Sequence, residues 1–136
     1  MKKPPEIEVR GYRPEDSAAL GFVPDGAHYG LTITEGARVG AYGGLTVVGS
    51  RFWAFFWSEP MFVCRRGRII HSMVRRGLKD AAARGIAPIY TLRDGRLSTS
   101  ARWLRLLGFR ELADHEKDEE LITMQRTVNM GIWRRG

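Results

Sequence analysis

The sequence predicts an α+β fold with a mixed, mostly antiparallel central sheet, two main helices and a strand–helix–strand crossover. Short segments of alternating apolar and polar residues fill the first half of the chain and indicate antiparallel strands. A long helical pattern with an apolar strand on either side predicts the crossover and a parallel strand pair. Residues 98–110, STSARWLRLLGFR, are typical of a short amphipathic helix that ends at Gly108 and leads directly into a strand.

Length and composition limit the classes of protein that fit. The 136 residues are enough for one domain, expected at residues 1–128, with a tail at 129–136. A hydrophobic fraction of 43% and a mean hydropathy of −0.28 are typical of a soluble globular protein. No apolar run approaches the roughly 18 residues of a membrane span, and MKKPPEIEVR lacks the apolar core of a secretory signal. Because Cys64 is the single cysteine, we expect a protein of a reducing, intracellular environment, such as the cytoplasm.

The N-terminal half is expected to supply a short helix and most of the sheet. Residues 7–12 alternate as a first strand, and residues 14–20 begin with proline and acids, which favour a helix start. Residues 29–34 and 39–48 form a hairpin through the turn EGAR, and glycines in its second strand indicate a bulge or a close backbone approach. Residues 51–57, RFWAFFW, are apolar on both faces, so this strand should be central.

The C-terminal half is expected to supply the main helices and the rest of the sheet. Apolar residues recur every three or four positions over residues 67–84, which predicts the long helix, and Gly85 ends it. Strands are expected at residues 86–92, 109–113 and 121–127, the last after the acidic turn ADHEKDEE. In the tail, Ile132 and Trp133 suggest docking onto another surface.

The junction Leu107-Gly108-Phe109 resembles the last conserved block of the GNAT superfamily, the acetyl-CoA-dependent N-acyltransferases. The expected order of elements is also similar to the GNAT fold over about residues 7–127. The resemblance implies a gap between strands 51–58 and 86–92 that holds the pantetheine arm of acetyl-CoA. It also implies that the pyrophosphate binds backbone N–H groups at the start of the long helix, where the helix dipole favours anions.

The expected phosphate site departs from the family pattern. Family members carry Gln or Arg, two residues, Gly, one residue and then Gly or Ala, whereas this chain has CRRGRI, with Ile69 at the second small position. The arginine side chains could still bind phosphate, because guanidinium groups suit it. The alternative is a charged helix start without a ligand. The candidate cofactor-binding residues are Trp57, Ser58, Cys64, Arg65, Arg66, Gly67 and Arg68.

The catalytic groups are weakly represented. Many active members have a tyrosine four residues before the glycine of LGF, where its hydroxyl protonates the leaving thiolate, and here that residue is Leu104. Glu59, just past RFWAFFW, is the best-placed general base, although a surface carboxylate is the simpler interpretation. Tyr90 could reach the thiol if it points into the gap, and core packing is the alternative. No metal site is predicted, because Cys64 is the single cysteine and no zinc spacing is present.

The charge distribution points to anionic partners or to a solvated helix face. Lysine and arginine number 22 against 15 acidic residues, and the net charge is +7. Basic residues gather over residues 65–84 and again over 93–110, whereas acidic residues gather at 114–120. A basic face of this kind suits CoA phosphates, nucleic acid or an acidic protein.

Two functions follow from the sequence. The first is an acetyl-CoA-dependent N-acetyltransferase acting on an amine. The second is a non-catalytic GNAT-like interaction protein with a degenerate acetyl-CoA site and protein assembly partners. It is favoured because both the tyrosine and an asparagine common earlier in the same block are missing, with Leu104 and Leu97 at those positions. The chain also resembles short phage-encoded GNAT-like proteins, including small internal virion proteins. That resemblance implies a virion component, or a protein of the bacterial host's cytoplasm.

Overall fold

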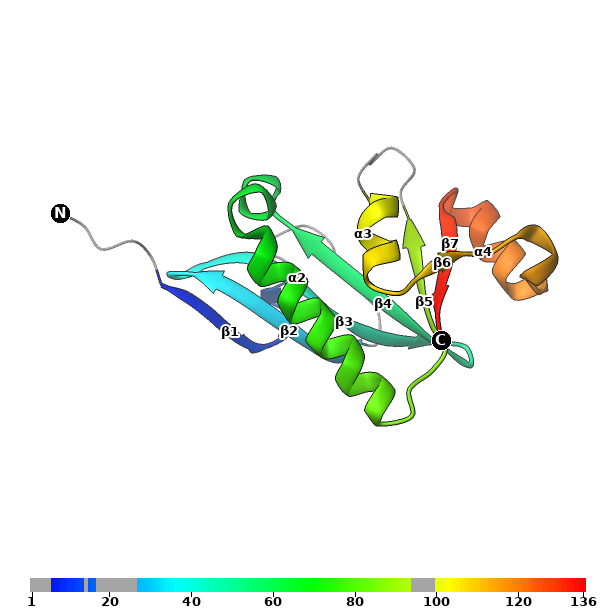
Figure 1. Ribbon diagram of the computed structural model, residues 1–136, viewed down its shortest axis with the longest axis horizontal. Coiled ribbons are helices and arrows are strands. Elements are labelled where there is room, and N and C mark those ends of the chain that lie inside the picture. The colour runs from blue at the N-terminus through cyan, green and yellow to red at the C-terminus, as the bar shows by residue number, and fades with distance from the viewer. Residues whose placement is uncertain (1–5, 14, 17–26, 94–99) are drawn as a thin grey trace.

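The computed structural model describes residues 6–13, 15–16, 27–93 and 100–136 (Figure 1). Within them, seven strands form one sheet in the order β1-β2-β3-β4-β5-β7-β6. The strands are β1 (Ile7–Gly11), β2 (Ala27–Glu35), β3 (Arg38–Val48), β4 (Arg51–Ser58), β5 (Ile89–Arg93), β6 (Arg110–Glu111) and β7 (Gly131–Arg135). The helices are α2 (Pro60–Ala83), α3 (Ser100–Leu106) and α4 (Glu119–Val128), with a 3-10 turn at Asp114–Glu116.

The sheet confirms the predicted α+β layout. Its strand pairs are antiparallel except for β4 and β5, which run parallel and are connected by α2. This is the predicted crossover, and β4, with three strands on either side, is central as its two apolar faces predicted. Gly108 has a φ of 92°, which confirms the left-handed glycine expected after α3.

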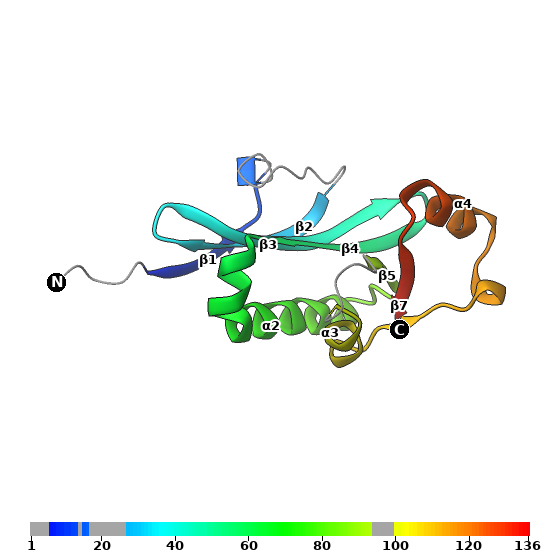
Figure 2. The same cartoon turned by 90° about the horizontal axis from the view of Figure 1, so that it is seen from above.

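Helices α2 and α3 cover one face of the sheet, which we call the helical face (Figure 2). Its core joins Leu78 of α2, Leu104 of α3 and Trp133 of β7 with Phe109, which lies between α3 and β6. On the second face, Leu121 of α4 packs with Trp53, Tyr90 and Ile132. No helix among the described residues is long and apolar enough to cross a membrane.

Helix α2 begins at Pro60, seven residues before the start predicted at residue 67, because its first turn packs against β3. Pro60 occupies the first position, where a missing N–H is tolerated. The ring of Phe62, 1% exposed, lies against Gly40, and a Cβ at Gly40 would stand only 2.5 Å from that ring. Arg66 has non-helical angles (φ −124°, ψ 23°), so the helix is kinked there and the predicted regular part follows the kink.

The predicted strand at residues 121–127 is wrong, because this segment forms α4. The side chain of Asp118 caps the helix by accepting a hydrogen bond from the backbone N of Leu121 at 3.0 Å. Glu119 and Glu120 follow at the positive end of the helix dipole. Leu121 is the one fully buried residue of this helix, and Met124 is half-buried against the same core cluster. These two residues are three positions apart, so they lie on the same side of the helix and face the sheet.

The expected tail at residues 129–136 contains β7, which lies inside the sheet between β5 and β6. The docking surface of Ile132 and Trp133 is therefore the protein's own core, where both are 1% exposed or less. The strands expected at residues 86–92 and 109–113 are shorter in the structure, where they span Ile89–Arg93 and Arg110–Glu111. The helix expected at residues 14–20 lies almost entirely outside the described residues.

A buried carboxylate attaches the segment after β1 to the second face of the sheet. Asp16, 3% exposed, accepts hydrogen bonds from both terminal nitrogens of Arg10 (2.9 and 2.6 Å) and from the Thr32 hydroxyl (2.6 Å). Burial by itself would raise the pKa of Asp16, but the bonds from Arg10 and Thr32 outweigh it and lower the pKa to about 2. The charged form of Asp16 is therefore the stabilising one.

Asp16→Asn should lower the free energy of unfolding by about 2–4 kcal/mol at pH 7, because it leaves Arg10 without its buried partner. Since folding lowers the pKa of Asp16 from 3.8 to about 2, its contribution is complete above pH 4 and decreases as the pH falls toward 2. Urea unfolding of both proteins across this range should show the difference between them shrinking by roughly 2 kcal/mol. A difference that does not change with pH would contradict this assignment.

Gly40→Ala and Gly77→Ala should have opposite effects. The first forces a methyl group into the Phe62 ring and should cost about 1–3 kcal/mol. The second places a methyl group where nothing lies within 4 Å, in the interior of α2, and should stabilise by about 1 kcal/mol. Thermal unfolding of the two variants measures both, and destabilisation by Gly77→Ala would contradict the open space beside it.

Candidate functional site

Strands β4 and β5 pair over three residues and then separate. Their register joins Phe52 to Ile89, Trp53 to Tyr90 and Ala54 to Thr91. At the last pair, the Thr91 hydroxyl donates a hydrogen bond to the Ala54 carbonyl oxygen at 3.0 Å. Beyond it, β4 continues to Ser58 in register with β3, and no described residue pairs with its other edge. Residues 55–58 therefore present a backbone edge toward the gap between β4 and β5.

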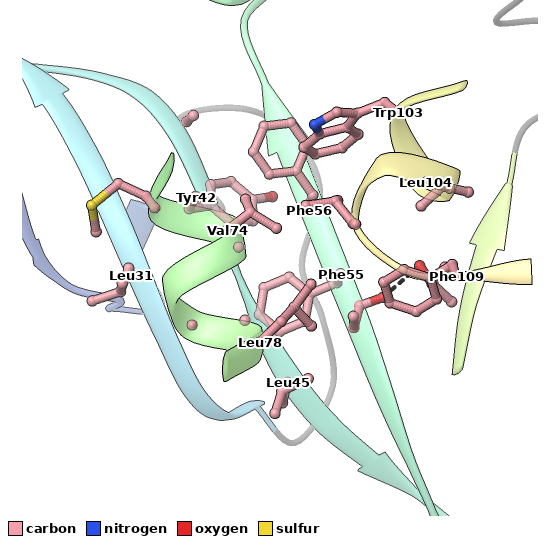
Figure 3. Close-up of a pocket in the computed structure, with 18 of the residues that line it drawn as sticks. Leu31, Tyr42, Leu45, Phe55, Phe56, Val74, Leu78, Trp103, Leu104 and Phe109 are labelled. Atoms are coloured by element: carbon pink, nitrogen blue, oxygen red, sulfur yellow. Dashed lines mark hydrogen bonds between the residues drawn. The ribbon is translucent and has the colours of Figure 1, made fainter. Parts of the chain in front are cut away.

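Aromatic side chains occupy the space between this edge and the helices. The rings of Phe56 and Trp103 meet edge to face, with centroids 5.3 Å apart. Trp103 also donates a hydrogen bond from Nε1 to Nδ1 of His71 on α2, at 3.1 Å. Figure 3 shows Phe56 and Trp103 next to each other beside β4, where α3 approaches it. We call Phe56, Trp103 and His71 the aromatic plug, because they connect β4, α3 and α2 beside the gap.

An apolar cavity of about 110 Å³ lies behind the plug, between the sheet and the two helices (Figure 3). Leu31, Phe55, Val74 and Leu104 are among the residues that line it, and none of the described lining residues is charged. An engineered cavity of about 150 Å³ in another protein holds benzene, so this one offers space for a small apolar group. It offers nothing to a phosphate.

The arginines at the start of α2 are paired with a carboxylate of the sheet. Glu35, at the end of β2, lies 3.2 Å from a nitrogen of Arg65 and 3.2 Å from Nε of Arg66. The Glu35 side chain is only 13% exposed, and this burial by itself would raise its pKa. The bond from Arg66 and the charge of Arg65 outweigh burial and lower the pKa instead. Both guanidinium groups are thus engaged at the place where the sequence predicted phosphate binding.

The other candidate cofactor residues do not converge on one point. Trp57 is 41% exposed and lies on the opposite face of β4 from Phe56, and the Ser58 hydroxyl donates to the Glu59 carbonyl oxygen at 2.9 Å. Cys64, Gly67 and Arg68 are exposed along α2.

The candidate catalytic residues are also apart from one another. Glu59 precedes α2 and forms an ion pair with Arg38. Tyr90 is buried on the second face, against Trp53 and beneath the guanidinium of Arg51, so it does not line the cavity on the helical face. Leu104, at the position of the expected tyrosine, is 8% exposed in the core. These side chains do not form a proton-transfer pair.

Sequence reasoning missed Glu35 and the aromatic plug. Glu35 is 30 residues from Arg65, and no local spacing connects them. Phe56 belongs to the RFWAFFW run, whose aromatic density was a signal of an unusual strand, but nothing in the sequence pairs it with Trp103. Among the described residues, no group of three or more His, Cys, Asp or Glu side chains could hold a metal ion.

Comparison with known proteins identifies the fold. No protein-family model matches the chain, and no curated protein matches its sequence. Solved structures do match. An acetyltransferase from Streptococcus agalactiae has a TM-score of 0.72 at 14% identity, covering 95% of this chain and 97% of that one. A GNAT-family acetyltransferase from Staphylococcus aureus has a TM-score of 0.68 at 10% identity, covering 96% and 98%.

N-acetylglutamate synthase from Neisseria gonorrhoeae, complexed with coenzyme A and N-acetyl-glutamate, has a TM-score of 0.65 at 14% identity. That match covers 98% of this chain but only 35% of the synthase, so the chain spans about a third of its length. The chain therefore has the GNAT fold, as the LGF junction predicted. At these identities the likeness extends to the fold and not to the chemistry.

Trp103→Phe should lower the free energy of unfolding by about 1 kcal/mol, because it removes the hydrogen bond to His71 and keeps a ring against Phe56. Trp103→Ala should cost about 3 kcal/mol, because it also removes the ring. Urea unfolding measures both. As a matched control, the exposed Trp57→Phe should change stability by less than about 0.5 kcal/mol, and equal losses at the two tryptophans would contradict the plug.

Proposed function

We propose that this GNAT-fold chain is a non-catalytic interaction protein whose acetyl-CoA site is degenerate. The observation that carries the proposal is the aromatic plug. Phe56 and Trp103 meet beside the edge of β4, where they line the apolar cavity, and the bond from Trp103 to His71 joins α3 to α2. A pantetheine arm in the gap would have to displace this ring pair and break that hydrogen bond.

The start of α2 supports the same proposal. A pyrophosphate needs free backbone N–H groups or free cations. Here α2 follows β4 after the single residue Glu59, and the N–H groups of Phe62 and Val63 donate to the Glu59 carbonyl oxygen. Arg65 and Arg66 are paired with Glu35, so binding phosphate would cost those ion pairs.

The lack of a placed catalytic acid and base also supports a non-catalytic role. Acetyl transfer needs a base for the amine and an acid for the departing thiolate. Leu104 replaces the expected acid, Glu59 is paired with Arg38, and Tyr90 lies on the other face of the sheet. Catalysis would have to proceed without any of the three.

An interaction role is consistent with the surface around the β4–α2 turn. Trp57, Met61 and Val63 are 41%, 61% and 41% exposed there. Exposed aromatic and methionine side chains are enriched at protein interfaces, so this turn is the region where a protein partner would bind. Association with a virion stays a prediction of the sequence resemblance, because the solved structures bear on the fold alone.

The alternative is an acetyl-CoA-dependent N-acetyltransferase that acts on an amine. One observation favours it: β4 and β5 still separate after Ala54 and Thr91, so the edge of residues 55–58 retains backbone groups for a pantetheine arm. Coenzyme A is present in the matched synthase from Neisseria gonorrhoeae, so a protein of this fold can hold it. On this alternative, the aromatic plug would have to open.

Acetyl-CoA at 1 mM should leave the melting temperature of the protein unchanged, because no preformed site stabilises the folded state. A site with a dissociation constant near 10 µM would instead add about 2.7 kcal/mol, roughly 9 °C for a chain of this size. Differential scanning fluorimetry measures the shift, with an active acetyltransferase as the positive control. A clear shift, together with release of free thiol from acetyl-CoA in the presence of amines, would establish the alternative.

A further inference from the structure

We propose that the outward face of α2 binds the phosphate backbone of double-stranded DNA. Four cations on the regular part of α2, after the kink at Arg66, carry the proposal: Arg68, Arg75, Arg76 and Lys79, which we call the basic stripe. At 3.6 residues per turn, Arg68, Arg75 and Lys79 fall within about 40° of one another around the helix, and Arg76 lies beside them. The stripe extends over about 16 Å of helix axis.

The stripe lies directly opposite the buried side of α2. Ile70, Leu78 and Ala81 are buried against the sheet, whereas all four cations of the stripe are exposed. None of the four forms an ion pair with a described residue, in contrast to Arg65 and Arg66 at the start of the same helix. Asp80 is the only acidic residue in α2. The stripe therefore presents unneutralised positive charge to solvent.

The composition of this face favours nucleic acid over a protein or a membrane. Protein interfaces contain an apolar or aromatic centre, but among the described residues no large exposed hydrophobic side chain lies between residues 67 and 84. A helix that lies on a membrane inserts its apolar side, and the apolar side of α2 is buried on the sheet. A row of cations alone suits a row of phosphates.

The same face favours a duplex over a single strand. Proteins that bind single strands stack the bases on aromatic side chains, and none is exposed on this part of α2. A duplex carries about one negative charge per 1.7 Å of axis, so a straight 16 Å row of cations can follow several phosphates. The acidic start of α4 lies on the second face of the sheet, whereas α2 covers the helical face (Figure 2), so it does not oppose this contact.

The test is fluorescence anisotropy of the full chain with a fluorescein-labelled 20-base-pair duplex at 50 and 200 mM NaCl. Four phosphate contacts give a slope of log K against log salt of about −3.6, which is a loss of about 150-fold between these concentrations. Arg75→Gln/Lys79→Gln should reduce the slope to about −1.8. Both substituted side chains are exposed, so circular dichroism should confirm an unchanged fold.

The matched control is Arg13→Gln/Arg126→Gln, which removes the same charge from exposed positions outside α2. This control should keep the wild-type slope. An equal reduction in both variants would overturn the proposal, because net charge alone would then explain binding. No binding at 50 mM NaCl, or tighter binding to the single strand, to an RNA duplex of the same sequence or to phosphatidylserine vesicles, would overturn it as well.

Discussion

The contact between Phe62 and Gly40 is the constraint on which the structure of this region depends. A strand residue without a side chain lets the ring lie against the backbone of β3, so the first turn of α2 is held directly beyond the end of β4. Only one residue separates β4 from α2, and no loop remains there in which backbone N–H groups could surround an anion. The kink at Arg66 then directs the regular part of α2 across the helical face, where Ile70 and Leu78 are buried.

The position of α2 brings the remaining parts of the region together. Its first turn brings Arg65 and Arg66 to Glu35, and its second part brings His71 to Trp103. An internal ion-pair cluster and an aromatic plug thus stand at the two places where the sequence resemblance implied binding of acetyl-CoA. The cations farther along α2 have no such partners in the part of the chain that the structure describes. We infer that the charge of this helix is divided between a structural role near Arg66 and a binding role beyond it.

Local patterns predicted much of this fold, and long-range contacts limited the prediction. RFWAFFW indicated a central strand because both its faces are apolar, and Gly108 indicated a helix end because its backbone must turn left-handed; both are confirmed. The prediction of a strand at residues 121–127 is wrong because the residues ITMQ within it fit a strand or a helix equally well. The signal that distinguishes the two is the helix cap at Asp118. The sequence did not predict β7, because its burial depends on its partners β5 and β6. The pairs Glu35–Arg65 and Phe56–Trp103 were missed for the same reason, since they form only through tertiary contact.

The most direct measurement is a titration of the ¹⁵N-labelled protein with coenzyme A, followed by two-dimensional NMR of its backbone amides. If the acyl-CoA site is closed, the amide resonances of residues 55–58 and of the first turn of α2 should not shift at millimolar coenzyme A. Weak shifts confined to residues 68–79 fit phosphate contacts with the basic stripe. Saturable shifts in residues 55–58, together with those of Trp103 and His71, would contradict the closed site and show that coenzyme A enters the gap between β4 and β5.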